Sequence, residues 1–295
     1  MKTLLGDIRY SLRVLRQSPV FTVTAVLTLA LGIGGTTGIF SLIHTVMLRS
    51  LPVADPASLY RIGESDDCCV EGGPQGEWGL FSFPLLERLK AAAPEFEQVT
   101  AFQAMPWQFS VRRASTERVA RPIRGEFVTG NYFSTFGVGS FAGRVFSVGD
   151  DQPSAPPVAV LSYRAWKGAY GGNPSVIGST FVIEGHPFTV VGIAPPGFFG
   201  ETLRSDPPDL WLPLQQEPLV RGENSLLHQS IGAWLRVIGR LRPGASIAGM
   251  SARFTGVMRQ WLKNDSGFPP EFMPEINRAL PKQNIHVIPV SYTHL

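Results

Sequence analysis

An uninterrupted apolar stretch spans residues 20–48 (VFTVTAVLTLALGIGGTTGIFSLIHTVML) and contains no Lys, Arg, Asp or Glu. A helix needs about 20 mainly apolar residues to cross the ~30 Å hydrocarbon layer of a membrane. A cleaved signal peptide is the alternative, but its apolar core has only about 7–15 residues and ends at a small-residue cleavage site. This stretch is longer and reaches Arg49 without a good site of that kind. It therefore predicts a transmembrane helix over residues 20–48.

The residues before this stretch carry an excess of positive charge. Residues 1–19 contain a single acid, Asp7, and four cations: Lys2, Arg9, Arg13 and Arg16. Because positively charged flanks stay in the cytoplasm, we expect a cytoplasmic N-terminus and a span that sends residues 50–295 across the membrane. In a Gram-negative cell this would place the chain in the inner membrane, with most of it in the periplasm.

The arginines of this segment fall on one face of a predicted amphipathic helix over residues 4–17. Arg9, Arg13 and Arg16 follow one another at i, i+4 and i+7, and leucines and an isoleucine form the opposite stripe. Such a helix lies in the membrane interface with its arginines toward anionic headgroups. An acidic cytoplasmic protein is the alternative partner for this face.

Four glycines lie close together inside the predicted span, at Gly32, Gly34, Gly35 and Gly38. Gly34 and Gly38 form a GxxxG pair, and small residues at this spacing let a second helix approach closely. A threonine hydroxyl at 36 or 37 could then bond across the contact. We expect this ridge to pack against other membrane helices.

The composition of the whole chain bounds the fold and the function. The chain has 31 Gly and 25 Pro with 44% hydrophobic residues, which indicates many turns in a folded, β-rich domain. The net charge of +3 is spread along the chain, and no zinc-finger spacing, RNP motif or basic run indicates nucleic acid. Cys68 and Cys69 are adjacent, so they form an incidental loop pair, an intermolecular bridge or a redox-labile vicinal disulfide.

Two predicted β-α-β units lie at the two ends of this part of the chain. The first contains a strand over 59–63, a helix capped by Ser82 with Pro94 beyond its end, and strand-like residues in 99–102 and 108–112. The second contains a strand over 234–241, a helix over 246–262 capped by Ser246, and a strand over 284–290. The apolar positions of this last helix recur every three or four residues: Ile247, Met250, Phe254, Val257 and Trp261.

The sequence between these units predicts short strands and many turns. A buried strand over 158–161 leads into a short helix capped by Ser162, and strands over 180–183 and 188–193 read as a hairpin. A further apolar strand is expected over 209–214. The predicted fold class is therefore α+β, with residues 49–115 and 231–295 forming one subdomain and residues 116–230 an inserted β-rich subdomain.

The sequence contains no recognisable catalytic or metal-binding motif. It lacks G-x-x-x-x-G-K-[ST], G-x-S-x-G and H-E-x-x-H, and its five histidines are separated from one another. The paired acids Asp66-Asp67 and Asp150-Asp151 lie among turn residues, where solvated loop acids are the first interpretation and weak Ca²⁺ contact the second. The aromatic residues Tyr163, Trp166 and Tyr170 are interpreted as core. We expect no enzymatic activity, no metal and no cofactor in this chain.

Several ordered motifs resemble one family along nearly the whole chain. The sequence is similar to MacB-type ABC transporter permeases, and most similar to the acidobacterial duplicated permease (ADOP) group. The motifs are Asp7-Ile8-Arg9-Tyr10, residues 29–34 (LALGIG), Gly130-Asn131-Tyr132-Phe133, residues 143–146 (GRVF), residues 158–163 (VAVLSY), residues 195–198 (PPGF) and residues 234–241 (WLRVIGRL) with Pro243-Gly244.

This resemblance implies a membrane permease that works with a separate or fused ABC ATPase, which holds the ATP. It also implies a periplasmic domain with a porter-like α/β part and an inserted β-rich part, a second permease copy in a dimer, periplasmic adaptor proteins as further partners, and three more helices in an FtsX-like membrane region. Residues 291–295 are unlike the family and are similar to translated sequencing-adapter sequence, so we expect a fragment of a longer permease.

The expected function is thus the coupling of cytoplasmic ATP hydrolysis to motion of a periplasmic domain, for export or efflux. A single-pass, membrane-anchored binding or sensor module is the alternative. An anchored hydrolase has the least support, because no arrangement of a nucleophile and a base is visible. Neither the substrate nor the direction of transport is specified by these residues.

Overall fold

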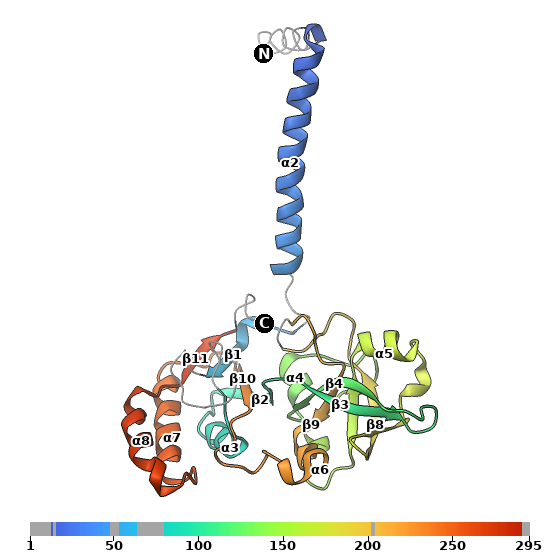
Figure 1. Cartoon of the computed structure of the whole chain (residues 1–295). Helices are drawn as coiled ribbons and strands as arrows, with labels where there is room; N and C mark the ends of the chain where they lie inside the picture. Colours follow the sequence, from blue (N-terminus) through green and yellow to red (C-terminus); the bar gives the residue numbers. More distant parts are fainter. Residues whose placement is uncertain (1–12, 14–15, 48–52, 64–79, 202–203, 291–295) are drawn as a thin grey trace. The chain divides into compact units, whose positions relative to one another are not determined.

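The computed structural model describes residues 13, 16–47, 53–63, 80–201 and 204–290 of the 295-residue chain. The chain divides into two units, Met1–Ser50 and Leu51–Leu295. The first unit contains the long helix α2 and the second is a mixed domain of helices and strands (Figure 1). The structure confirms the predicted α+β class and the predicted apolar N-terminal helix.

Helix α2 runs from Pro19 to Met47, one residue away from the predicted span at each end. Its segment Pro19–Gly38 has a mean hydropathy of 1.7 and is long and apolar enough to cross a membrane. The hydroxyl groups of Thr24 and Thr28 donate to the carbonyls of Val20 and Thr24, each at 2.9 Å. Because these hydroxyls bond within the helix, they can lie in an apolar medium without a desolvation cost.

Four strands of the second unit form an antiparallel sheet. Their order is β11 (His286–Pro289), β1 (Leu59–Gly63), β10 (Leu235–Leu241) and β2 (Phe96–Gln103). Since each neighbour is antiparallel, β1 and β2 run parallel on either side of β10, and β10 and β11 run parallel on either side of β1. Each parallel pair is connected through helices: α3 (Phe83–Ala91) leads to β2, and α7 (Met250–Asn264) with α8 (Met273–Ala279) leads to β11. The result is two β-α-β crossings that share one sheet.

Helices α3 and α7 bury apolar residues on the same side of this sheet. Ser82 caps α3 as predicted, with its hydroxyl 3.4 Å from the backbone N–H of Leu85. The buried residues of α7, at spacings of three or four, join the same apolar cluster as Leu235 and Val237 of β10: Met250, Phe254, Met258 and Trp261. The amphipathic pattern thus identified the packed face of α7.

The predicted beginning of α7 at Ser246 is wrong. The helix begins at Met250, after Gly249, whose φ of 77° places it in the left-handed region. A residue in that conformation interrupts a right-handed helix, and glycine adopts it without steric cost. The Ser246 hydroxyl instead accepts a 3.1 Å bond from the N–H of Ala248, in the turn before the helix.

Six further strands form a closed barrel. Their hydrogen-bonded circuit runs β3 (Trp107–Arg113), β4 (Arg121–Val128), β9 (Leu210–Pro213), β6 (Val158–Leu161), β8 (His186–Ile193), β7 (Thr180–Ile183) and back to β3. The short β5 (Ala142–Gly143) also pairs with β8.

The predicted hairpin is the β7–β8 pair, which turns through Glu184 and Gly185, both at positive φ. β3 pairs with barrel strands, although the sequence grouped residues 108–112 with the first β-α-β unit.

Alternate residues of the barrel strands face opposite sides. In β6, Ala159 and Leu161 belong to the cluster that contains the barrel interior, whereas Val158 and Val160 belong to a second cluster. This second cluster, here called the junction cluster, combines residues of the outer barrel face, the four-stranded sheet and helix α4 (Tyr132–Phe136). Its members include Phe102, Val128, Tyr132, Phe133, Phe136, Phe198, Trp211 and Ile238.

The sheet and the barrel meet at this cluster. β2 pairs with β4 at one register position, Phe102 opposite Val128.

Strand β4, helix α4 and helix α6 (Glu217–Arg221) were not predicted, nor was α8. The connections contain short 3₁₀ helices: Pro56–Ser58, Val148–Asp150, Pro174–Val176, Leu214–Gln216, Gly222–Asn224, Pro270–Phe272 and Leu280–Lys282.

Candidate functional site

The predicted helix-packing residues lie on an open surface of α2. A Cβ atom placed on Gly32, Gly34, Gly35 or Gly38 would have no atom within 4 Å, apart from its own helix backbone. At about 100° per residue, Gly34, Gly35 and Gly38 fall within about 100° of arc. The Thr36 hydroxyl donates to the Gly32 carbonyl, so its proton is not available to a second helix. The glycines therefore offer a smooth face, and their contact with another helix stays a prediction.

Two of the predicted interface arginines can be placed in the structure. Arg13 and Arg16 are exposed and helical, and Arg9 lies outside the described residues. Their proposed contact with headgroups stays a prediction. Asp66, Asp67, Cys68 and Cys69 also lie outside the described residues.

The interpretation of Asp150 and Asp151 as solvated loop acids is wrong. Asp150 binds both terminal nitrogens of Arg144 at 2.7 Å and accepts the N–H of Ser147 at 2.8 Å. Partial burial would raise the pKa of Asp150, but these bonds outweigh it and hold the pKa below its usual value. Asp151 accepts the N–H groups of Gly130 and Gln215 at 2.8 and 2.7 Å, and burial raises its pKa. Both side chains fix the conformation of their loop.

The described residues contain no group of three or more His, Cys, Asp and Glu that could hold a metal ion. Of the aromatic residues predicted as core, Trp166 is buried and donates its indole N–H to the Asn173 carbonyl at 2.9 Å. Tyr163 and Tyr170 pack against the same cluster. The prediction that these rings belong to the core is confirmed.

A groove of about 610 Å³ lies between the sheet part and the barrel part of the second unit. α3 and β2 contribute Phe83, Lys90 and Phe96, and the opposite side includes Asn131 and Asp151. The groove combines apolar rings with charged and amide side chains, as ligand-binding clefts do. It can therefore receive a mixed polar and apolar group.

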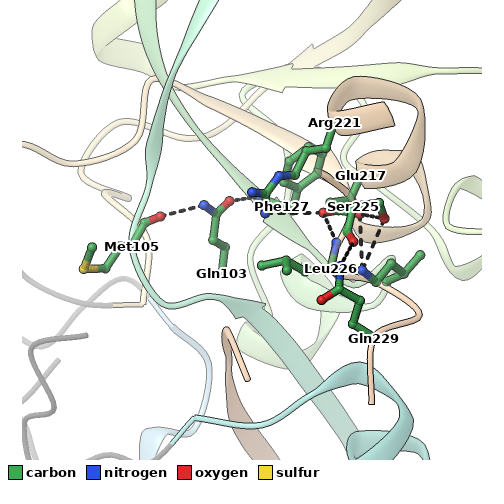
Figure 2. A network of polar contacts seen from close by, with 9 residues as sticks. Gln103, Met105, Phe127, Glu217, Arg221, Ser225, Leu226 and Gln229 are labelled. Atoms are coloured by element: carbon green, nitrogen blue, oxygen red, sulfur yellow. Dashed lines mark hydrogen bonds and ion pairs between the residues drawn. The ribbon is translucent and has the colours of Figure 1, made fainter. Parts of the chain in front are cut away.

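A second groove, of about 720 Å³, lies beside α6. Arg221 lines it with its guanidinium 3.8 Å from the ring centroid of Trp107, a cation–π contact. Figure 2 shows how Arg221 is placed: Glu217, fully buried, accepts bonds from the Ser225 hydroxyl and from the N–H of Leu226 at 2.8 Å. Arg221 lies 3.6 Å from the same carboxylate. The network fixes the segment after α6 and thereby one wall of this groove.

A buried amide links the sheet to the barrel in the same region (Figure 2). Gln103 at the end of β2 donates to the carbonyl of Met105 at 2.7 Å and accepts the N–H of Phe127 of β4 at 3.3 Å. Its side chain is almost fully buried. Since both ends of the amide are bonded, it stabilises one relative position of the two strands.

The most unusual chemistry in the described residues is a buried charge cluster of Glu126, Glu201, Arg204 and Arg236. Glu126 is fully buried and Glu201 is 1% exposed. Glu201 accepts the Tyr132 hydroxyl and a terminal nitrogen of Arg204, both at 2.7 Å. Neither carboxylate oxygen of Glu126 has a hydrogen-bond partner, and Arg204 is 3.9 Å away.

The electrostatics of this cluster favour a neutral Glu126. Burial raises the pKa of Glu126 well above its usual value, and the charge of Glu201 raises it further. Arg204, Arg236 and the Trp211 indole act in the opposite direction with smaller effect. Burial also lowers the pKa of Arg236. One signal of this site is visible in the sequence, an acid directly before the apolar residues Phe127 and Val128, but strand β4 itself was not predicted.

Comparisons with known proteins agree with this architecture. The sequence profile described as MacB-like periplasmic core domain matches residues 22–257. No curated protein sequence matches the chain. The periplasmic region of MacB from Actinobacillus actinomycetemcomitans has a similar fold, with a TM-score of 0.52, 12% identity, and coverage of 82% of this chain and 93% of that chain.

Two other solved structures are also similar. A domain described as part of a permease from Porphyromonas gingivalis gives a TM-score of 0.52 at 14% identity, with coverage of 82% and 94%. The extracellular domain of the ABC-type transporter YknZ from Gram-positive bacteria gives 0.48 at 14% identity, with coverage of 68% and 93%. At these identities the structural likeness concerns the fold, and the narrower resemblance to the ADOP group stays a prediction.

The family match covers most of the chain and includes the two β-α-β crossings up to α7, the barrel and most of α2. It confirms the resemblance expected from the ordered motifs. The chain belongs to the MacB-like periplasmic core domain family of ABC transporter permeases.

Proposed function

We propose that this chain is a permease subunit that couples ATP hydrolysis by a partner ATPase to motion of its extracytoplasmic domain, for export or efflux. The observation that carries the proposal is the position of the family match. It begins at residue 22, inside α2, and ends at residue 257, inside α7. One family unit therefore contains both a helix fit to cross a membrane and the mixed domain.

The charge pattern supports an inner-membrane location with a cytoplasmic N-terminus. Arg13 and Arg16 precede the apolar segment Pro19–Gly38 and are exposed, and positively charged flanks remain on the cytoplasmic side. Residues 53–290 would then lie in the periplasm. The sheet with its two crossings would be the porter-like part and the barrel the inserted part.

The open glycine face of α2 supports association with other membrane helices. With no side chain at Gly34 and Gly38, a helix of a second permease copy can approach closely. The ATPase, with its bound ATP, would dock at the cytoplasmic side near the N-terminal arginines, and periplasmic adaptor proteins would contact the domain. The chain itself would hold no cofactor and catalyse no reaction.

The test is a change of bulk on the glycine face. We expect Gly34→Leu with Gly38→Leu to abolish dimer cross-linking of the full chain in detergent and to reduce recovery of an ABC ATPase from the native host. Ala25→Leu is the matched control, because it lies about 180° from Gly34 around the helix and adds the same bulk. Unchanged dimer and ATPase recovery in the double variant would contradict this contact.

The same preparation distinguishes the rival function. A monomeric chain that recovers no ATPase and binds a small molecule in the groove near Lys90 would indicate an anchored binding module. That groove, at about 610 Å³, is the observation that keeps this alternative open.

A further inference from the structure

We propose that the buried charge cluster is a proton-sensitive lock that fixes the angle between the four-stranded sheet and the barrel. The inference concerns the second unit alone and goes beyond the proposed transport function. It starts from the placement of four side chains on three different parts of the fold: Glu126, Glu201, Arg204 and Arg236.

The cluster lies where the two parts meet. Glu126 is on the barrel strand β4, two residues from Val128, which pairs with Phe102 of the sheet strand β2. Arg236 is on the sheet strand β10, directly opposite Phe102. Glu201 and Arg204 belong to the connection between β8 and β9. A change in the relative position of sheet and barrel must therefore change the distances within the cluster.

The backbone connection across this boundary is weak, so side chains must fix its geometry. β2 and β4 share one register pair, whereas β10 and β2 share seven. The side chains that cross it include Gln103, the hydroxyls of Thr100 and Thr129 at 2.7 Å, the rings of Phe102 and Tyr132 at 6.1 Å, and the buried charge cluster. Of these, only the charge cluster can change its charge with pH.

The arrangement leaves one member incompletely bonded. Glu201 already uses its oxygens for Tyr132 and Arg204. In the described part of the chain, Glu126 is fully buried without a well-formed hydrogen bond, the Trp211 indole being the one donor that acts on it, and the Nη1 atom of Arg204 has no partner. A neutral carboxyl group tolerates this position far better than a carboxylate, because an unsolvated charge is costly.

Among the described residues, the groups that act on Glu126 come from β9, β10 and the segment after β8: Trp211, Arg236, Glu201 and Arg204. Glu126 also acts on Tyr132 of α4, while Arg61 of β1 acts on Arg236 and Asp206 acts on Arg204. Burial and Glu201 favour the protonated acid, and the two nearby arginines oppose this with smaller effect. The arrangement in the structure therefore favours the protonated form of Glu126, and ionisation of Glu126 would favour an arrangement in which water reaches the carboxylate.

The proton on Glu126 makes the stability of the folded state depend on pH. Because the folded state holds a proton on Glu126 above the ordinary value of 4.5, folding is favoured at low pH by this group. The stabilisation declines as the pH rises from about 4.5 through the raised pKa of the folded state. The thermal midpoint of the full chain in detergent is expected to fall over that range.

The first measurement compares variants by their thermal midpoint between pH 4.5 and 9. Glu126→Gln, which copies the protonated acid, should have a midpoint that stays nearly constant while that of the parent chain falls. Glu217→Gln is the matched control: this buried acid is fully hydrogen-bonded, so its variant should be less stable but keep the fall. If Glu126→Gln does not fold, Glu126→Met supplies a second neutral side chain.

The second measurement separates a lock from an acid that affects stability alone. Nitroxide labels at Ala169→Cys on α5 (Tyr163–Tyr170) and Gln260→Cys on α7 report the distance between barrel and sheet. Cys68 and Cys69 are replaced by Ser in this background. We expect the distance distribution to shift as the pH rises in the parent chain, and to stay at its low-pH form in Glu126→Gln.

Three results would overturn the proposal: a distribution that does not change with pH, the same shift in Glu126→Gln, or a fall of the midpoint that persists in that variant. Each can occur while the ATPase and dimer assays still succeed, so the lock and the transport function fail separately.

Discussion

Replacing Tyr132 by Phe would remove one hydroxyl group from the junction cluster and leave its ring in place. The hydroxyl donates a 2.7 Å bond to Glu201, and both residues are buried. A hydrogen bond to a charged group contributes about 1.5–3 kcal/mol. We therefore expect the Tyr132→Phe variant to lose about 2 kcal/mol of unfolding free energy, because Glu201 keeps its bond to Arg204 but loses the one from the hydroxyl.

Thermal denaturation of the full chain in detergent, followed by circular dichroism, measures this loss. For a domain of this size each kcal/mol shifts the midpoint by about 2–4 °C, so the expected decrease is about 4–8 °C. Tyr170→Phe is the matched control, since the Tyr170 hydroxyl is buried without a hydrogen-bond partner. Its change should stay within about 0.5 kcal/mol. Equal midpoints for the two variants would refute the assigned role of the Tyr132 hydroxyl.

Two further substitutions test the loop that carries Asp150 and Asp151. Gly130→Ala places a Cβ atom 2.6 Å from the Ser147 carbonyl and should lower the free energy of unfolding by about 1–3 kcal/mol in a denaturation experiment. Gly139→Ala is the control, because open space surrounds Gly139 and its variant should be as stable as the parent chain. Equal stability of the two variants would show that the loop moves to accommodate the new Cβ atom. Asp150→Asn should remove a stabilisation that is present above about pH 3.8 and lost as the pH falls through the lowered pKa of the folded state. A parent chain and variant with the same acid unfolding curve would contradict the role of the Arg144 pair.

Sequence patterns predicted the elements whose signals are local. The span α2, the strands β1 and β6, and the caps Ser82 and Ser162 agree closely with the structure, because hydrophobic runs and capping residues act over a few positions. α7 was predicted with its buried face but with an early start, since a glycine at positive φ is not visible as such in a sequence.

The barrel and the buried charge cluster could not be predicted in the same way. Closure depends on the parallel pairing of β4 with β9, which are separated by some 80 residues, and no local pattern specifies such a partner. The local sequence around Glu126 indicates an exposed acid. Its burial follows only from the packing of α4 and β9 against the outer barrel face. Asp151 was misassigned for the same reason, because its partners Gly130 and Gln215 are distant in sequence, whereas the partners of Asp150, Arg144 and Ser147, lie within six residues and were overlooked.

Closure of the six-stranded circuit also has a mechanical consequence. In an open sheet an edge strand can slide past its single neighbour, but a closed barrel has no edge strand, so sliding of any barrel strand would break two ladders at once. The barrel is therefore stiff against shear. The single register pair between β2 and β4 is the compliant point, and a load on the sheet would concentrate its strain there instead of within the barrel.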